Sequence, residues 1–199
     1  LAYLYAAGAP LRYLAINAGA LAVGFGLAGL LISIGRHAHR RQGAATLALG
    51  LLLLASCVFG VTVDGATRWL RVAGFSLQPS LLIVPPMVVL FASARDRLST
   101  CGIALVSVAL ALQPDRAMAG ALVAGLLALA LFRTDRMVIL ALAAALVGFG
   151  AALLQADVQP AMPYVEGVLF TSFEVHPLAG LAVLGGAALM VAPAFIGGI

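Results

Sequence analysis

Long apolar stretches alternate with short charged or proline-bearing segments along the whole chain. In a lipid bilayer every backbone amide must be paired within its own helix or in a closed barrel, and the alternating pattern of a barrel strand is absent. We therefore predict an all-α fold, a polytopic integral membrane helix bundle of about seven transmembrane helices. The predicted spans cover Tyr13–Ile34, Ala44–Val63, Leu81–Ala94, Thr100–Leu112, Ala117–Phe132, Met137–Gln155 and Leu178–Ile196.

Two of these spans have special features. The third is short and carries Pro85 and Pro86, so we expect it to be kinked or partly unwound. Residues 1–199 are expected to form a single transmembrane domain that ends in the helix at 178–199. Four small residues give the first span faces on which a neighbouring helix can pack. These are Gly19, Gly24, Gly26 and Gly29.

The arginines indicate which loops face the cytoplasm. If the loop at residues 35–43 is cytoplasmic, alternation of the spans also places loops 95–99 and 133–136 there. That side then holds seven of the 11 arginines, which agrees with the positive-inside rule. The outer side receives the N-terminal dozen residues and the segments Asp64–Ser80, Gln113–Arg116 and Ala156–Pro177.

Composition excludes a water-soluble globule. Hydrophobic residues make up 64% and charged residues 9% of the chain, whereas soluble domains have about 45–50% and about 25%. Every basic residue is an arginine, but no run interleaves several of them with aromatic residues. We therefore expect no nucleic-acid surface.

The cysteines and histidines give no strong metal signal. Cys57 and Cys101 lie in separate apolar runs without a CxxC or CxxxC spacing, so we interpret them as small buried hydrophobes. His37 and His39 provide too few ligands for a metal and fit a basic surface that faces anionic lipid headgroups. His176 leaves open an axial ligand to haem or chlorophyll, but it lies in a loop. We expect no metal and no cofactor.

Three short signatures follow one another on the outer side. In chain order they are Gly65-Ala66-Thr67-Arg68-Trp69-Leu70, Gln78-Pro79-Ser80 and Gln113-Pro114-Asp115. With them, the chain over residues 12–177 resembles the SEDS family (shape, elongation, division and sporulation). Its RodA and FtsW members are glycosyltransferases that polymerise peptidoglycan from lipid II. The resemblance implies a multi-pass protein of the bacterial inner (cytoplasmic) membrane.

The sequence departs from this family at positions that bear on catalysis. The family has Glu after QPS and Lys three positions later, where this chain has Leu81 and Val84. The Gly and Thr that follow QPD in the family are replaced by Ala117 and Met118. An ionisable pair inside a membrane is costly and usually functional. Leu81 and Val84 therefore favour plain packing.

The catalytic aspartate of the family lies in an outer segment with a PExxTDF-like pattern. We find no such pattern in these 199 residues, and Pro163-Tyr164 followed by Phe173–Pro177 is only a weakened form of the family's large outer loop. We therefore expect no catalytic residue in this chain. We also expect the chain to begin in mid-sequence or after processing, because its first residue is not Met.

Several outer residues allow two interpretations. Arg68 could hold a diphosphate, or it could cap or pair with Asp64 while Trp69 anchors the loop at the membrane interface. Asp115 and Arg116 could form a local ion pair or simple turn chemistry. Three carboxylates could supply an acid and a base, but a solvated loop is the better interpretation. They are Asp157, Glu166 and Glu174.

Two hypotheses for function follow. The favoured one is a non-catalytic SEDS-like accessory or scaffold subunit of a larger membrane complex, which contacts other integral membrane subunits through Gly/Ala-rich helix faces and also binds membrane lipids. The alternative is a lipid II-dependent glycosyltransferase of cell-wall synthesis or cell division. Candidate contacts to lipid headgroups are Arg36, Arg40, Arg41, Arg68 and Trp69.

Overall fold

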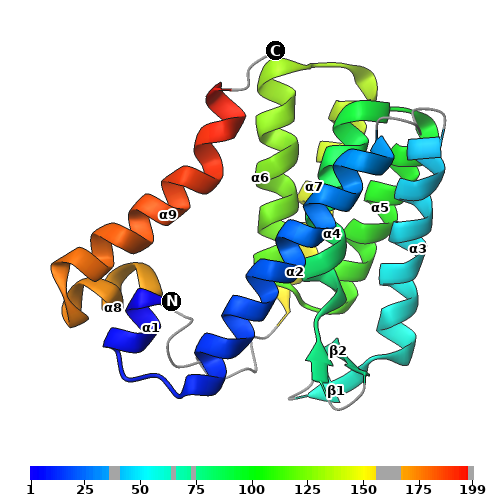
Figure 1. Cartoon of the computed structure of the whole chain (residues 1–199). Helices are drawn as coiled ribbons and strands as arrows, with labels where there is room; N and C mark the ends of the chain where they lie inside the picture. The colour runs from blue at the N-terminus through cyan, green and yellow to red at the C-terminus, as the bar shows by residue number, and fades with distance from the viewer. Residues whose placement is uncertain (36–40, 64–65, 73–74, 156–166, 197–199) are drawn as a thin grey trace. The chain divides into compact units, whose positions relative to one another are not determined.

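The structure is a computed structural model that describes residues 1–35, 41–63, 66–72, 75–155 and 167–196. Contacts between Cα atoms divide the chain into two compact units. We call Gly35–Gln159 the central unit, and Leu1–Ile34 together with Pro160–Ile199 the terminal unit. Each is described by itself (Figure 1).

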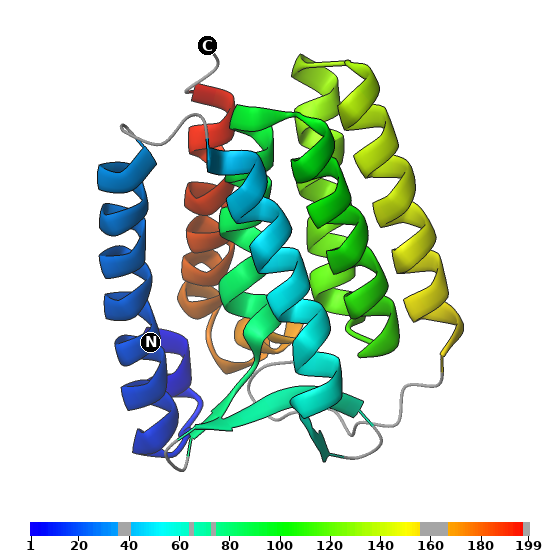
Figure 2. The ribbon, with the colours of Figure 1, turned by 90° about the vertical axis from the view of Figure 1, so that its right-hand side faces the viewer.

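The central unit is a bundle of apolar helices. Its core is formed by large side chains such as Leu53, Met87, Phe91, Ile103 and Leu122, each almost completely buried. The helix α5 packs against both α3 and α7, and α4 and α6 complete the bundle (Figure 2). The helices are α3 (Gln42–Phe59), α4 (Pro79–Ala94), α5 (Arg97–Leu112), α6 (Arg116–Phe132) and α7 (Arg136–Leu154).

Glycines let these helices approach closely. A Cβ atom built on Gly102 of α5 would lie 2.6 Å from the carbonyl oxygen of Thr46 in α3, and one on Gly50 would lie 2.6 Å from the carbonyl oxygen of Gly102. The packing through small residues is therefore used inside the central unit. The same role for the glycines of the first span stays a prediction.

A three-stranded antiparallel sheet follows α3. It consists of β1 (Val61–Val63), β2 (Ala66–Val72) and β3 (Phe75–Leu77) in the order β1-β2-β3. Two sequence predictions were therefore wrong, because Val61–Val63 was placed in a span and 64–80 in a loop. The alternation of β-branched and aromatic residues with glycines at 65 and 74 is a hairpin signal that the long apolar runs obscured.

The two ends of the central unit differ. The sheet and the turn at residues 113–115 lie at one end, which we call the sheet end (Figures 1 and 2). The loops that join α4 to α5 and α6 to α7 lie at the other, which we call the arginine end because Arg95, Arg97, Arg133 and Arg136 lie there. The alternation of loops expected from the sequence is thus present in this unit.

The helix α4 remains α-helical through Pro85 and Pro86. Of the two outcomes expected there, a kink or partial unwinding, partial unwinding was wrong and the kink stays a prediction. Met87 and Phe91, one and two turns further on, are completely buried in the core. Their burial stabilises the helix against the loss of two backbone hydrogen bonds at the prolines.

The terminal unit contains α1 (Ala2–Ala6), α2 (Leu11–Gly35), α8 (Val168–Val175) and α9 (Pro177–Ile196). The short helices α1 and α8 both contact α9. The hydroxyl of Tyr3 lies 3.1 Å from that of Thr171. The helix α8 corrects the prediction that 156–177 is entirely loop, because one face of the apolar run 168–173 finds a partner in α9.

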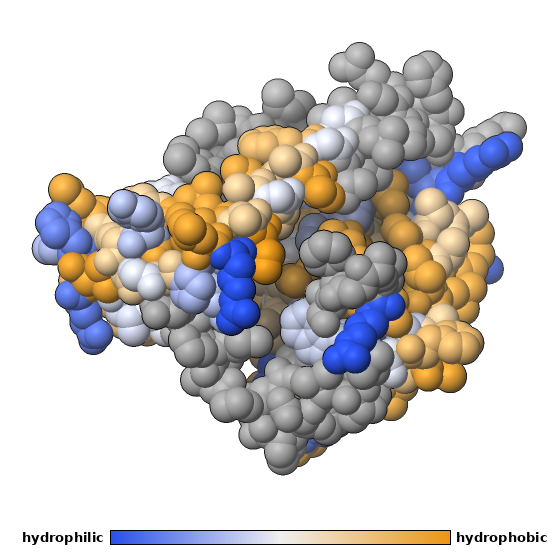
Figure 3. Space-filling view, turned by 60° about the horizontal axis from the view of Figure 1, so that its bottom comes forward, coloured by the Kyte–Doolittle hydropathy of each residue, from blue (hydrophilic) through white to orange (hydrophobic). Residues whose placement is uncertain are grey.

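All seven predicted apolar stretches are thus mainly helical in the described residues, which confirms the helical fold. Two of the described helices, α3 and α7, are long and apolar enough to cross a membrane. The helices α4, α5 and α6 are apolar but have 16, 16 and 17 residues, or roughly 24–26 Å against a hydrocarbon core of about 30 Å. Hydrophobic side chains cover much of the surface in Figure 3, and hydrophilic residues occupy a few separate patches.

Candidate functional site

The second and third signatures meet at the sheet end around one carboxylate. The Oδ2 atom of Asp115 accepts hydrogen bonds of 2.7 Å from both the Nε2 group of Gln78 and the hydroxyl of Ser80. Gln78 Nε2 also lies 3.1 Å from Ser80 Oγ. Residues 35 to 37 positions apart in the sequence therefore share a single anion.

Asp115 also begins α6. Its Oδ1 atom accepts a hydrogen bond from the backbone N–H of Met118 at 3.2 Å, which makes it the N-cap of the helix. The side chain is completely buried. Oδ1 therefore caps α6, while Oδ2 connects this helix start to the start of α4.

Gln113 connects the same turn to α3. Its Nε2 group donates to the hydroxyl of Ser56 at 2.8 Å and lies 3.4 Å from the sulfur of Cys57. Gln113 is completely buried, and its Oε1 atom has no hydrogen-bond partner among the described residues. We call Ser56, Cys57, Gln78, Ser80, Gln113 and Asp115 the sheet-end cluster.

Ser56 was not among the site residues predicted from the sequence. The sequence signal for it was weak, since it is one small hydroxyl residue in an otherwise apolar run. Cys57 was interpreted as a small hydrophobe, and its partly buried thiol lies 3.7 Å from the carbonyl oxygens of Leu53 and Ala109. Only the folded bundle brings these two side chains to Gln113.

Arg116 reaches across to the end of α7. Its Nε and Nη2 groups lie 3.4 Å from the carbonyl oxygens of Ala152 and Leu153, and Nη2 also donates to the carbonyl oxygen of Gln155. The Nε2 group of Gln155 donates in turn to the carbonyl oxygen of Ala111. These bonds satisfy carbonyls that a helix end leaves unpaired.

Two of the positions at which the chain departs from the family pattern lie in α4 and differ in exposure. Val84 is 2% exposed and belongs to the core, as its apolar character predicted. Leu81 is 55% exposed, and the packing expected for it stays a prediction. A side chain one helical turn from Val84 can still point outward, because α4 buries only one face.

The first signature lies in the sheet. Arg68 and Trp69 belong to β2, and Trp69 is paired in register with Val61 of β1 and is half-buried. The interpretation of this segment as a loop was therefore wrong, because strand pairing satisfies its backbone. Gly65, Asp64 and the side chain of Arg68 lie outside the described residues, so their contacts remain predictions.

Other candidates are scattered. Arg41 is exposed next to the start of α3, and Glu174 is exposed on α8. The Nδ1 atom of His176 accepts the backbone N–H of Leu178 at 3.1 Å, which is turn chemistry. Among the described residues no group of three or more His, Cys, Asp or Glu side chains could hold a metal ion. Arg36, Arg40, His37, His39, Asp157 and Glu166 lie outside the described residues.

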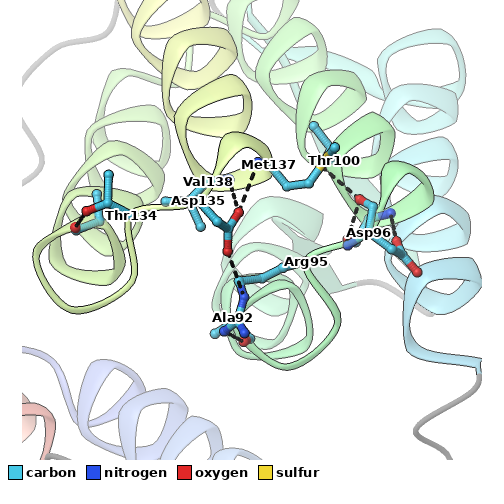
Figure 4. A network of polar contacts seen from close by, with 10 residues as sticks. Ala92, Arg95, Asp96, Thr100, Thr134, Asp135, Met137 and Val138 are labelled. Carbon is cyan, nitrogen blue, oxygen red and sulfur yellow. Dashed lines mark hydrogen bonds and ion pairs between the residues drawn. The ribbon is translucent and has the colours of Figure 1, made fainter.

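A second polar network lies at the arginine end and was not predicted. Arg95 and Asp135 form an ion pair of 3.0 Å between the ends of α4 and α7, and Arg95 also donates to the carbonyl oxygen of Ala92 at 2.8 Å (Figure 4). Asp135 accepts from the backbone N–H groups of Met137 and Val138 and so caps α7.

Asp96 caps the neighbouring helix at the same end. It forms a capping box with Ser99, in which its Oδ1 atom accepts from the backbone N–H of Ser99 and the hydroxyl of Ser99 accepts from the N–H of Asp96. Gly43 of α3 leaves room for this carboxylate, since a Cβ atom there would lie 2.2 Å from Asp96 Oδ2. The acidic residues at this end therefore serve helix starts.

The comparisons with known proteins give one family. The model of the family described as Cell cycle protein, FtsW/RodA/SpoVE, matches residues 7–162, which is more than half of the chain. The match includes all three outer signatures. No curated protein and no solved structure matches the chain. The chain therefore belongs to the FtsW/RodA/SpoVE family of cell cycle proteins, a family of polytopic membrane proteins.

Proposed function

We propose that this chain is a non-catalytic member of its family that acts as an accessory or scaffold subunit of a larger membrane complex. The observation that carries the proposal is the burial and hydrogen bonding of Asp115. It is the one charged side chain among the described residues that is fully buried, and both of its oxygens are engaged in bonds that hold the bundle together.

A general base needs a carboxylate oxygen within hydrogen-bond reach of the substrate proton. Asp115 instead accepts three hydrogen bonds, from Gln78, Ser80 and Met118. Removing it from these donors would leave buried polar groups unpaired. The role that these bonds indicate for Asp115 is structural: it caps α6 and connects α6 to the start of α4.

The helix positions that could hold an ionisable pair also favour this proposal. Val84 lies in the apolar core and Leu81 points outward from α4. Neither side chain is ionisable, so these two positions supply no acid and no base. The buried interior of the described bundle is apolar except for hydroxyls, Gln42 and the sheet-end cluster.

The alternative is a glycosyltransferase that uses lipid II, and family membership together with the three outer signatures favours it. It requires a carboxylate that activates the attacking hydroxyl. The carboxylates at both ends of the described central unit cap helices, namely Asp96, Asp115 and Asp135. We therefore prefer the scaffold.

A scaffold subunit must present a surface to its partner. The helices of the central unit use Gly50, Gly102 and Gly148 against each other. We assign the contact with other integral membrane subunits to α2, whose described side chains are mostly exposed and which contains Gly19 and Gly26 seven residues apart. Seven residues are about two helical turns, so both glycines lie on one face.

Co-purification tests this assignment. The full chain with a C-terminal tag should retain one or more integral membrane proteins after mild detergent extraction from its host. Gly19→Leu together with Gly26→Leu should lose them, since two leucines prevent close helix approach. Ala20→Leu is the matched control, because it lies about 100° around the same helix. If the wild-type chain runs alone, or if the double variant keeps every partner, the scaffold assignment fails.

A further inference from the structure

Three neighbouring helices of the central unit are bounded at both ends by polar residues. After the first residue, α4, α5 and α6 contain no charged side chain. The residues at their N-caps and C-caps are aspartate, glutamine or arginine in every case. In chain order these pairs are Gln78 and Arg95, Asp96 and Gln113, and Asp115 and Arg133. The apolar length of each helix therefore cannot exceed the distance between its caps.

These helices are short for a membrane span. The helices α4 and α5 have 16 residues each and α6 has 17, or about 24–26 Å at 1.5 Å per residue. A typical hydrocarbon core is about 30 Å thick, and an average tilt of about 20° lowers the thickness that a helix covers by roughly a further 1–2 Å. The three helices therefore fall short of a typical bilayer by at least about 4 Å.

The hydrogen bonds at the sheet end prevent these helices from lengthening there. Gln113 and Asp115 are completely buried, and they bond to Ser56 of α3 and to Gln78 and Ser80 at the start of α4. A further helical turn on α5 or α6 would break these bonds and leave buried polar groups unpaired. The packing of the central unit thus fixes the level of the polar groups at this end.

The sheet marks the same boundary beyond α3. The helix ends at Phe59 and β1 begins at Val61. Among the described strands, β1 and β3 each pair with β2 on one side only, so backbone N–H and C=O groups are left along their other sides. An open sheet edge is not found in lipid-exposed hydrocarbon. The sheet therefore fits the headgroup region, directly after the 18 residues of α3.

The arginine end sets the second boundary. Arg95 pairs with Asp135, which caps α7, and Asp96 caps α5 (Figure 4). The side chains of Arg97 and Arg133 are exposed and long enough to extend their charge toward headgroups. The capping carboxylates are short and held in place, and a charge in hydrocarbon is costly. Both ends of the short helices are therefore fixed by polar groups.

These limits come from the central unit alone. The caps and the sheet all lie within Gly35–Gln159, so the helix lengths are the same whichever faces of this unit the terminal unit covers. The helices α2 and α9 have 25 and 20 residues. A long helix can tilt to fit a thin bilayer, whereas a short helix cannot extend to fit a thick one. The short helices therefore decide which bilayer thickness fits the protein.

We propose that the lateral surface of the central unit fits a bilayer with a hydrocarbon core of about 24–26 Å, thinner than a typical one. The lipids that match this surface are phospholipids with short acyl chains. In a bilayer of typical thickness, the protein draws the headgroups around it inward. The cost of this deformation grows with the mismatch, so thinner membranes are favoured.

Deuterium nuclear magnetic resonance of the lipid tests this proposal. The full chain is reconstituted in phosphatidylcholine whose deuterated, monounsaturated acyl chains have fourteen, eighteen or twenty-two carbons. Thinning lowers the order of acyl chains, so the protein should lower it at eighteen and twenty-two carbons and change it least at fourteen. The control is a synthetic helix of about twenty leucines, which spans about 30 Å and should change the order least at eighteen carbons.

Thermal unfolding in the same vesicles gives a second measurement and allows variants. The unfolding midpoint, followed by circular dichroism, should be highest at fourteen carbons and lowest at twenty-two. Arg133→Leu should reduce this fall, because it replaces the charge at the end of α6 with an apolar side chain and so lengthens the apolar stretch. Arg71→Leu, on the exposed part of β2, is the matched control and should keep the wild-type fall.

Two results would overturn the proposal. One is an acyl-chain order that the wild-type protein changes least at eighteen or twenty-two carbons, since the bundle would then match a typical or thicker bilayer. The other is an unfolding midpoint that does not depend on acyl-chain length, or that Arg71→Leu and Arg133→Leu shift equally. Each result can occur whether or not the chain binds partner subunits, so this proposal and the scaffold assignment can fail separately.

Discussion

In the sheet-end cluster, individual side chains connect three segments that are far apart in the sequence. Asp115 joins α4 to α6, and Gln113 in the same turn joins it to α3. A buried polar group is costly unless it is paired, but paired groups specify one arrangement of the helices. These residues therefore act on the geometry of the bundle.

Asp115→Ala should destabilise the protein strongly. The change strands the donors of Gln78, Ser80 and Met118 in a buried site and removes a helix cap. We expect a loss on the order of 2–4 kcal/mol in the free energy of unfolding, measured by chemical denaturation in detergent. Asp135→Ala, which removes a cap that is partly exposed, should cost only about 1 kcal/mol. Equal losses of unfolding free energy in the two variants would contradict this structural role of Asp115.

The sequence predicted part of this cluster. It placed Gln78, Ser80, Gln113 and Asp115 on one side of the membrane, because they lie in loops of the same parity. It could not predict the hydrogen bonds between them, since these depend on how α4 packs against α6. Ser56 was missed because a hydroxyl in an apolar run can bond to its own helix, as Ser56 also does to Leu53.

At the scale of helices, close backbone contacts set the packing. Gly102 lies where α5 crosses α3, and Gly148 lies where α7 crosses α5. The apolar periods along the chain predicted that these segments are helices. They could not predict which helices pair, because almost every face of every span is apolar. The sheet was missed because β1 continues the apolar run of α3 and the segment after it was interpreted as a loop.

Gly102→Ala tests the α3–α5 contact. The added methyl would lie 2.6 Å from a backbone oxygen of Thr46, which cannot move independently of α3. Overpacking of this kind costs about 1–3 kcal/mol, which should appear as a lower thermal unfolding midpoint in detergent. Gly150→Ala in α7 is the control, because no atom lies within 4 Å of the added methyl. It should be neutral or stabilising by up to about 1 kcal/mol. The reverse order of the two variants would contradict this packing.

At the scale of the whole molecule, family membership and the apolar bundle make the chain a polytopic membrane protein. The central unit has polar clusters at both ends, and the arginine end collects Arg95, Arg97, Arg133 and Arg136. The positive-inside rule predicts that this end faces the cytoplasm. The sheet end then faces outward.

Cysteine labelling in intact cells tests this orientation. In a background of Cys57→Ser and Cys101→Ser, Arg71→Cys on the exposed part of β2 should react with a membrane-impermeant maleimide. Thr134→Cys, which is exposed between α6 and α7, should react only after the membrane is permeabilised. The opposite pattern would reverse the predicted topology.

The central claim is that this family member does not polymerise lipid II. The most direct test is to incubate the purified full chain in lipid vesicles with labelled lipid II and a penicillin-binding protein, with an active FtsW or RodA enzyme as positive control. We expect polymer from the control and none above background from this chain, because these 199 residues contain no PExxTDF-like pattern and Asp115 is buried in its own hydrogen bonds. Polymer that forms with this chain and disappears when it is omitted would contradict the account.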